Sequence, residues 1–193
     1  ALYIGIDGDL MFDDFDIIDI DIDVGTYGNV WHHVVGTLEG TTSKLYFDGV
    51  LKTTGGTNRS GSSAGDLFIG KRETAAWYFN GFIDDVRIYN YARTAAQIKA
   101  DYLAGAARGT TIKVAPTTAV RDASQGLVGH WKMDETSWTV DCSTDTVMDS
   151  SGNGKNGDAC PNAGGLAPGA GKYGSAGSFD GTEDYVAIPD IDF

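Results

Sequence analysis

Proline, positive charge and long apolar runs are all scarce in this chain of 193 residues. It has 4 prolines but 27 glycines, a balance typical of short strands joined by tight turns. Its 14 basic residues face 27 acidic ones, so the net charge of −13 disfavours nonspecific binding to nucleic acid or anionic membranes. No stretch approaches the roughly 20 apolar residues of a membrane-spanning helix. We expect no nucleic-acid partner and no membrane insertion, and cations are the natural small partners.

The start of the chain lacks an initiator methionine and a signal peptide. Ala1 leads directly into what reads as a strand. We therefore expect a processed product or a piece of a longer protein.

Motifs of common catalytic sites are also missing. The chain has no Gly-x-Ser-x-Gly nucleophile elbow, no phosphate-binding loop and no catalytic Cys/His arrangement. We predict that the protein is not an enzyme.

Only two cysteines occur, Cys142 and Cys160, within one loop rich in Gly, Asp and Ser. They have neither the CxxC spacing nor the nearby histidine that a zinc site needs. We expect a disulfide that closes this loop, and with it an extracellular or cell-surface location. The alternative is two free thiols in a cytosolic protein.

Alternating apolar and polar residues indicate many short strands. Asp7-Gly8 and Asp48-Gly49 each separate two such runs, which is a strong hairpin signal. A helix is expected only at about residues 94–104, and residues 105–124 have no periodicity and read as a linker. Further strands are expected within 126–135 and 172–193. The fold class is therefore all-β, an antiparallel sandwich or jelly roll.

Several long segments resemble a known family. "VWHHVVGTLEGTTSKLYFDGVL", "LFIGKR" and "FNGFIDDVRIYNYARTAAQIKADY" are similar to the C-terminal half of laminin-G-like, concanavalin A-like jelly-roll domains. "GLVGHWKMDE", "DSSGNGKNG" and "GKYGSAGSFDGTEDYVAIP" are similar to the N-terminal half. The resemblance implies a two-sheet antiparallel jelly-roll sandwich.

The order of the two halves is reversed relative to that family. Residues 1–104 correspond to the C-terminal half, 105–124 to a linker and 125–193 to the N-terminal half. Half a sandwich would expose its inner face and open strand edges, so the halves must meet. The chain is a window from a tandem array, a permutant that closes on itself, or a subunit whose halves pair between chains. The last arrangement would give a homo-oligomer or a filament.

The run "DIIDIDIDV" places Asp19, Asp21 and Asp23 on one face of a strand. Its spacing mimics the Glu-x-Asp-x-Glu pattern of laminarinase-type glycoside hydrolases, but aspartate has a shorter reach than the glutamates it would replace. It also fails as an EF-hand loop, because Val24 and Val30 stand where Gly and Glu are needed. We interpret the run as a solvent-facing acidic strand, with a cation site as the alternative.

Calcium ligands are expected elsewhere. The family often holds a structural calcium, and its two motif strands from opposite ends of the sequence lie near one another. The resemblance therefore points to Asp84 and Asp85 together with Asp180 and Asp184. The alternative is that these acids cap turns and pair with Arg87 or Lys172.

Aromatic residues in loops are candidates for stacking on sugar rings. Trp77 and Tyr78 lie in one loop and Trp138 in the cysteine loop, whereas Trp31 and Trp131 are expected in the core. We predict a non-catalytic adhesion, carbohydrate-binding or structural repeat stabilised by calcium, with a glycan or a neighbouring protein subunit as partner. The alternatives are a self-assembling surface subunit, or a glycoside hydrolase or its accessory domain.

Overall fold

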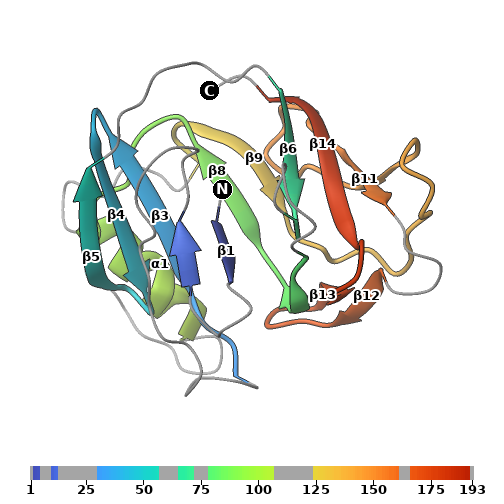
Figure 1. Ribbon diagram of the computed structural model, residues 1–193, viewed down its shortest axis with the longest axis horizontal. Coiled ribbons are helices and arrows are strands. Elements are labelled where there is room, and N and C mark those ends of the chain that lie inside the picture. The colour runs from blue at the N-terminus through green and yellow to red at the C-terminus, as the bar shows by residue number, and fades with distance from the viewer. Residues whose placement is uncertain are drawn as a thin grey trace. The chain divides into compact units, whose positions relative to one another are not determined.

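The computed structural model of the chain describes residues 2–4, 10–12, 30–56, 65–71, 78–106, 124–160 and 166–191. These residues form strands β1 to β14 and the helix α1 (Figure 1). All the hydrogen-bonded pairs among these strands are antiparallel. The predicted all-β fold with antiparallel sheets is confirmed. No helix among the described residues is long and apolar enough to cross a membrane.

The chain divides into two compact units. Unit 1 contains Ala1–Ser60 and Tyr91–Gln125, and unit 2 contains Gly61–Asn90 and Gly126–Phe193. Each unit therefore combines one segment from the first half of the chain with a later segment.

Unit 1 contains two small sheets. β1 (Leu2–Ile4) pairs with β2 (Leu10–Phe12), and β3 (Val34–Glu39), β4 (Thr42–Phe47) and β5 (Val50–Gly56) form a three-stranded sheet. The predicted hairpin at Asp48-Gly49 joins β4 to β5, and both residues have positive φ, 51° and 72°. Aspartate and glycine tolerate this conformation, which matches the twist of the strands.

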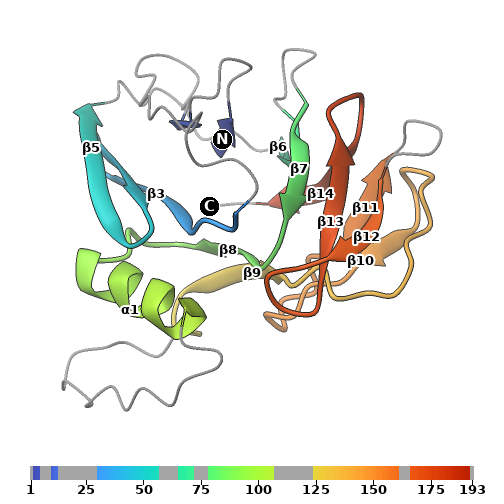
Figure 2. The same ribbon diagram turned by 90° about the horizontal axis from the view of Figure 1, so that it is seen from below.

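The helix α1 (Ala95–Ala106) lies beside β5 in unit 1 (Figure 2). Its start has a physical cause, because the Gln97 backbone N–H donates to Thr94 Oγ1 and the Thr94 backbone N–H donates to Gln97 Oε1. This reciprocal pair satisfies backbone donors that a helix start otherwise leaves without partners. Residues 107–123, most of the predicted linker, lie outside the described residues.

Unit 2 contains three sheets. The first has the order β10 (Asp145–Val147), β11 (Gly157–Cys160), β14 (Tyr185–Ile191), β6 (Gly65–Ile69). The second has the order β12 (Ala167–Ala170), β13 (Ser175–Asp180), β7 (Asn80–Ile83). The third pairs β8 (Val86–Tyr89) with β9 (Leu127–Trp131).

The two halves of the sequence meet in unit 2. β6 pairs with β14 and β8 with β9 (Figure 1), and β7 pairs with β13 (Figure 2). Each pair joins a strand that precedes the linker to one that follows it. Three strands of the first half are thus paired with strands of the second half within the same chain.

The core of unit 2 draws on all three sheets. Its buried members are Ile69, Trp131, Met133, Val147, Ala159, Leu166, Phe179, Val186 and Ile188. Trp131 is completely buried, as predicted, and its Nε1–H donates to the Lys155 carbonyl at 2.7 Å. Burying an aliphatic side chain such as Val186 contributes roughly 1.5–3 kcal/mol. The alternating pattern of β14 therefore fixes which of its faces turns away from the core.

Candidate ligand-binding face

Some predicted site residues cannot be placed. Asp19, Asp21, Asp23 and Trp77 lie outside the described residues. The interpretation of the acidic run as a solvated strand remains a prediction.

The four predicted calcium ligands occupy opposite ends of one strand pair. Asp180 is the register partner of Asn80, whereas Ile83, next to Asp84, is the partner of Gly177. Asp84 lies four positions after Asn80 and directly follows β7, which corresponds to roughly 13 Å along extended chain. The strands lie side by side, as the resemblance implies, but their carboxylates form two separate groups.

At one end, Asp180 and Asp184 organise a turn. The Thr182 backbone N–H donates to Asp180 Oδ1 at 2.7 Å, and the Asp180 backbone N–H donates to Asp184 Oδ2 at 3.0 Å. The hydrogen bond from Thr182 holds the pKa of Asp180 below its ordinary value. Both acids thus stabilise the turn between β13 and β14.

At the other end, Asp85 forms ion pairs. Its Oδ1 lies 2.6 Å from His130 Nε2, and its Oδ2 lies 2.8 Å from Arg87 Nη2. Burial acts to raise the pKa of Asp85, but the hydrogen bond to His130 and the charges of Arg87 and His130 outweigh it and hold the pKa below its ordinary value. Asp85 is therefore already held by the Arg87 guanidinium and the His130 ring.

Asp84 faces a different environment, the turn between β12 and β13. The Tyr173 backbone N–H donates to Asp84 Oδ2, and the Ser175 backbone N–H donates to Asp134 Oδ1. Asp84 Oδ1 is buried without a hydrogen-bond partner. Burial and the charges of Asp85 and Asp134 raise the pKa of Asp84. This end of the strand pair therefore has an excess of negative charge.

Among the described residues, no group of three or more His, Cys, Asp or Glu side chains is arranged to hold a metal ion. The four predicted ligands lie in two groups at opposite ends of the strand pair, and a calcium ion held by them stays a prediction. Asp84 has two features of a cation ligand. A second carboxylate, Asp134, binds the same turn, and Asp84 Oδ1 is buried without a hydrogen-bond partner. Asp134 was not among the predicted ligands, because it is distant from Asp84 along the chain.

The outer face of the sheet β10–β11–β14–β6 carries a different set of residues. Ile69, Val186 and Ala159 are buried, so their strand neighbours point away from the core. One register row on this outer face runs across the four strands in the order Phe68, Ala187, Asp158, Asp145. Neighbouring strands are about 4.8 Å apart, so Phe68 and Asp158 stand roughly 10 Å apart with a small alanine between them.

Two aromatic rings border this alanine. Phe68 and Tyr185 make an edge-to-face contact with ring centroids 5.7 Å apart. Both side chains are partly exposed. An aromatic pair beside a small residue can receive one face of a flat or ring-shaped ligand.

A lysine lies over both rings. Lys71 Nζ is 4.0 Å from the centroid of Phe68 and 3.7 Å from that of Tyr185. These distances are within the range of cation–π attraction. Tyr78, one of the predicted aromatic candidates, is the cross-strand partner of Lys71 and so belongs to the same neighbourhood.

Gly70 makes the position of Lys71 attainable. Its φ of 91° is a conformation that residues with a side chain rarely adopt, and a Cβ there would lie 2.5 Å from a ring carbon of Phe179. The Gly70 carbonyl also accepts a hydrogen bond from the Phe79 backbone N–H at 2.8 Å. The chain can therefore turn sharply after β6 only because residue 70 is glycine.

The other end of the row is acidic. Burial and the nearby charges of Asp145 and Asp141 raise the pKa of Asp158. Asp158 Oδ1 is buried without a hydrogen-bond partner, although the residue as a whole is partly exposed. The outer face thus combines an aromatic side with a side of hydrogen-bond acceptors.

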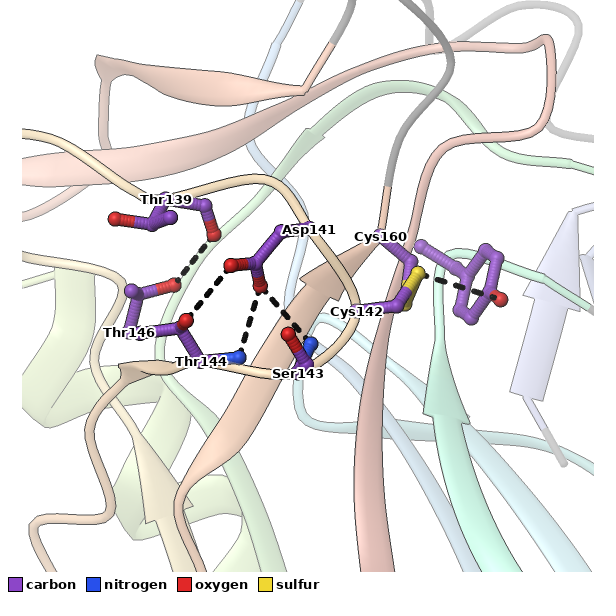
Figure 3. The surroundings of a disulfide bond; sticks show 8 residues. Thr139, Asp141, Cys142, Ser143, Thr144, Thr146 and Cys160 are labelled. Atoms are coloured by element: carbon purple, nitrogen blue, oxygen red, sulfur yellow. Dashed lines mark hydrogen bonds between the residues drawn. A yellow bond between two sulfur atoms is a disulfide. The ribbon is translucent and has the colours of Figure 1, made fainter.

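A disulfide bond links Cys142 to Cys160 next to this face (Figure 3). Asp141 stabilises the loop by accepting hydrogen bonds from the backbone N–H groups of Ser143 and Thr144 and from Thr144 Oγ1. Cys160 is the register partner of Tyr185, so the disulfide borders the aromatic pair.

Trp138 points elsewhere. Its ring packs against the core cluster of unit 2, and its Nε1–H donates to Glu135 Oε2 at 3.0 Å. Its ring therefore contributes to packing, and we do not assign it to the outer face. Phe68, Lys71 and Tyr185 were not among the predicted site residues, although the alternation in "LFIG" and "DYVAI" places Phe68 and Tyr185 opposite the apolar positions.

Comparison with known families identifies part of the chain. Residues 13–99 match the family model described as the concanavalin A-like lectin/glucanases superfamily. This part of the chain is similar to that superfamily. A comparison with curated proteins and one with solved structures each found no match.

The match agrees with the resemblance inferred for the first half of the sequence. It spans β3 to β8 and the first residues of α1. Lectins and glucanases are both named in the superfamily, so the similarity is compatible with a carbohydrate ligand and decides nothing about catalysis.

Proposed function

We propose that this concanavalin A-like protein is a non-catalytic carbohydrate-binding module of adhesion type. The glycan binds on the outer face of the sheet β10–β11–β14–β6. One observation carries the proposal: the row from Phe68 through Ala187 to Asp158 places stacking rings and hydrogen-bond acceptors on either side of a small residue.

The dimensions of this row suit a sugar ring. A pyranose presents one apolar face of C–H groups, which stacks on aromatic rings, and hydroxyl groups around its edge, which donate to carboxylates. The separation of roughly 10 Å between Phe68 and Asp158 accommodates one ring with hydrogen bonds at its edge. Such sites combine apolar surface with a few placed polar groups.

The non-catalytic part of the proposal rests on the residue types. The run at Asp19–Asp23 has aspartate at each position where the glycoside hydrolase pattern has glutamate. Retaining hydrolases need two carboxyl groups about 5–5.5 Å apart, so the loss of a methylene group at both ends is unfavourable.

We also propose an extracellular or cell-surface location. The disulfide between Cys142 and Cys160 supports it, because such bonds persist in oxidising compartments. An adhesion role would make the glycan part of a neighbouring surface.

A calcium ion is part of the proposal at Asp84 and Asp134. It would supply positive charge where two carboxylates hold one turn and where burial and the charges of Asp85 and Asp134 raise the pKa of Asp84. Backbone carbonyls and water would supply its remaining oxygen ligands.

Two substitutions test the glycan site, one that fills it and one that removes a ring. We expect Ala187→Arg and Phe68→Ala each to weaken binding about tenfold or more, because the first occupies the space between the rings and Asp158 and the second removes a stacking ring. Binding is measured first on a glycan array and then by calorimetry with the best ligand.

The matched controls are Ala167→Arg and Phe82→Ala. Ala167 is an exposed strand alanine, and Phe82 is an aromatic side chain that is 49% exposed, both in the sheet β12–β13–β7. Equal losses from the controls, or binding that survives Ala187→Arg, would place the ligand elsewhere. Release of reducing ends from a bound glycan would contradict the non-catalytic assignment.

A further inference from the structure

The rings of Phe68 and Tyr185 already hold a cation. The Lys71 ammonium lies 4.0 Å from one ring centroid and 3.7 Å from the other, so the two aromatic faces share a single positive charge. Ring faces attract ammonium groups through their negative quadrupole, and pairs of rings do so more strongly than one. This part of the outer face is therefore built to receive an alkylammonium group.

A ligand that stacks on these rings must compete with Lys71. The side chain arrives from just beyond the end of β6 and is flexible, with four rotatable methylene groups, so it can withdraw. A neutral sugar ring would replace a cation–π contact with an apolar one. A sugar that carries its own ammonium group would restore the same contact.

The same outer face also carries several negatively charged side chains. Asp145 and Asp158 stand in the register row of Phe68, and the charge of Asp141 also reaches Asp158. Asp66, two residues before Phe68 on β6, is exposed as well. Anionic sugars would meet like charges here, whereas a protonated amine would be attracted.

We infer that the glycan recognised at this face carries free protonated amino groups, and that Lys71 occupies the place of such a group until the ligand displaces it. The ligand class is a glucosamine-type oligosaccharide without N-acetyl groups. The inference rests on the proposed carbohydrate-binding function. It makes Lys71 a residue that opposes binding.

Lys71→Met provides the test, because methionine keeps an apolar stem and removes the ammonium. We expect the variant to bind a glucosamine tetramer roughly two- to fivefold more tightly than the wild type, the range of an exposed cation–π contact. The fully N-acetylated tetramer should gain less, because Lys71→Met relieves it of competition for the rings but not of repulsion between two ammonium groups. Both are measured by calorimetry at neutral pH, with thermal melting to confirm that the variant is folded.

Lys52→Met is the matched control. Lys52 is exposed and lies 5.9 Å from the Phe47 ring centroid in unit 1, so the change removes the same charge and a weaker cation–π contact. If Lys52→Met tightens binding as much, the gain comes only from net charge and the inference is overturned.

Other outcomes separate this inference from the proposed function. Unchanged or weaker amine binding by Lys71→Met would overturn the inference, and so would an equal gain for the N-acetylated tetramer. Wild-type binding only to other glycans, abolished by Ala187→Arg, would overturn it and leave the proposed function intact. Absence of binding to every glycan tested would overturn both.

Discussion

Gly70 is a residue at which backbone and packing requirements coincide. Its φ is 91°, and a Cβ would lie 2.5 Å from Phe179. We expect Gly70→Ala to lower the free energy of unfolding by about 2–4 kcal/mol, the sum of the left-handed backbone penalty and overpacking of a core ring. Urea unfolding followed by tryptophan fluorescence measures it.

Gly152→Ala is the control for that experiment. Gly152 has nearly the same φ, 90°, but nothing lies within 4 Å of the position of a Cβ. The free energy of unfolding of Gly152→Ala should fall only by the backbone contribution, about 1 kcal/mol. Equal losses at the two positions would show that the contact with Phe179 contributes nothing.

Two adjacent carboxyl groups should respond to pH with opposite signs. The pKa of Asp85 is held low, so its ion pairs stabilise the protein above the unfolded pKa of about 3.9, and this contribution disappears as pH falls through the lower folded pKa. We expect Asp85→Asn to lower stability by roughly 1 kcal/mol at neutral pH, with the difference from wild type vanishing in acid.

Asp84→Asn provides the contrast. Because the pKa of Asp84 is raised, its ionised form is unfavourable in the folded protein, and the wild type gains stability relative to the variant as pH falls through the raised pKa. Urea unfolding between pH 3 and 7 with a chelator present distinguishes the two trends. Parallel curves for the two variants would contradict the assigned environments.

At the scale of elements, the turn between β12 and β13 depends on distant acids. Asp84 and Asp134 bind the backbone N–H groups of Tyr173 and Ser175, so both ends of the turn are fixed by carboxylates that repel each other. A cation that binds only the folded state would stabilise this arrangement by mass action.

We therefore expect calcium to raise the melting temperature by a few degrees and a chelator to reverse the rise. Asp84→Asn should abolish the response, whereas Asp180→Asn, at the other end of the strand pair, should keep it. Calorimetric melting with and without calcium measures both. Loss of the response in Asp180→Asn would instead support the four-carboxylate site expected from the sequence.

At the scale of the whole molecule, strand pairing within the chain predicts the solution state. β6, β7 and β8 find their partners β14, β13 and β9 in the same chain. We expect light scattering to give the mass of one chain, 20.4 kDa, independent of concentration and of a chelator. Polymers that grow with concentration would mean that neighbouring chains exchange these strands, and assembly would then become the primary function.

Local features of the fold were predictable from the sequence. The turn at Asp48-Gly49, the helix that begins after Thr94, and the burial of Trp131 each follow from residues close together in the chain. Turn conformation, capping and alternation depend on neighbours, so short segments specify them. The resemblance to concanavalin A-like domains rested on motifs of the same local kind.

Only the tertiary structure decided which side chains lie next to one another on neighbouring strands. The row that joins Phe68, Ala187 and Asp158 depends on the registers of β6 and β11 against β14, and a shift of one residue would turn each side chain to the other face. The separation of Asp84 from Asp180 and the approach of Asp134 to Asp84 have the same origin. A sequence specifies which strands form, but the contacts between distant strands are selected by the burial of a shared core, and the ligand face lies on the side that this burial leaves exposed.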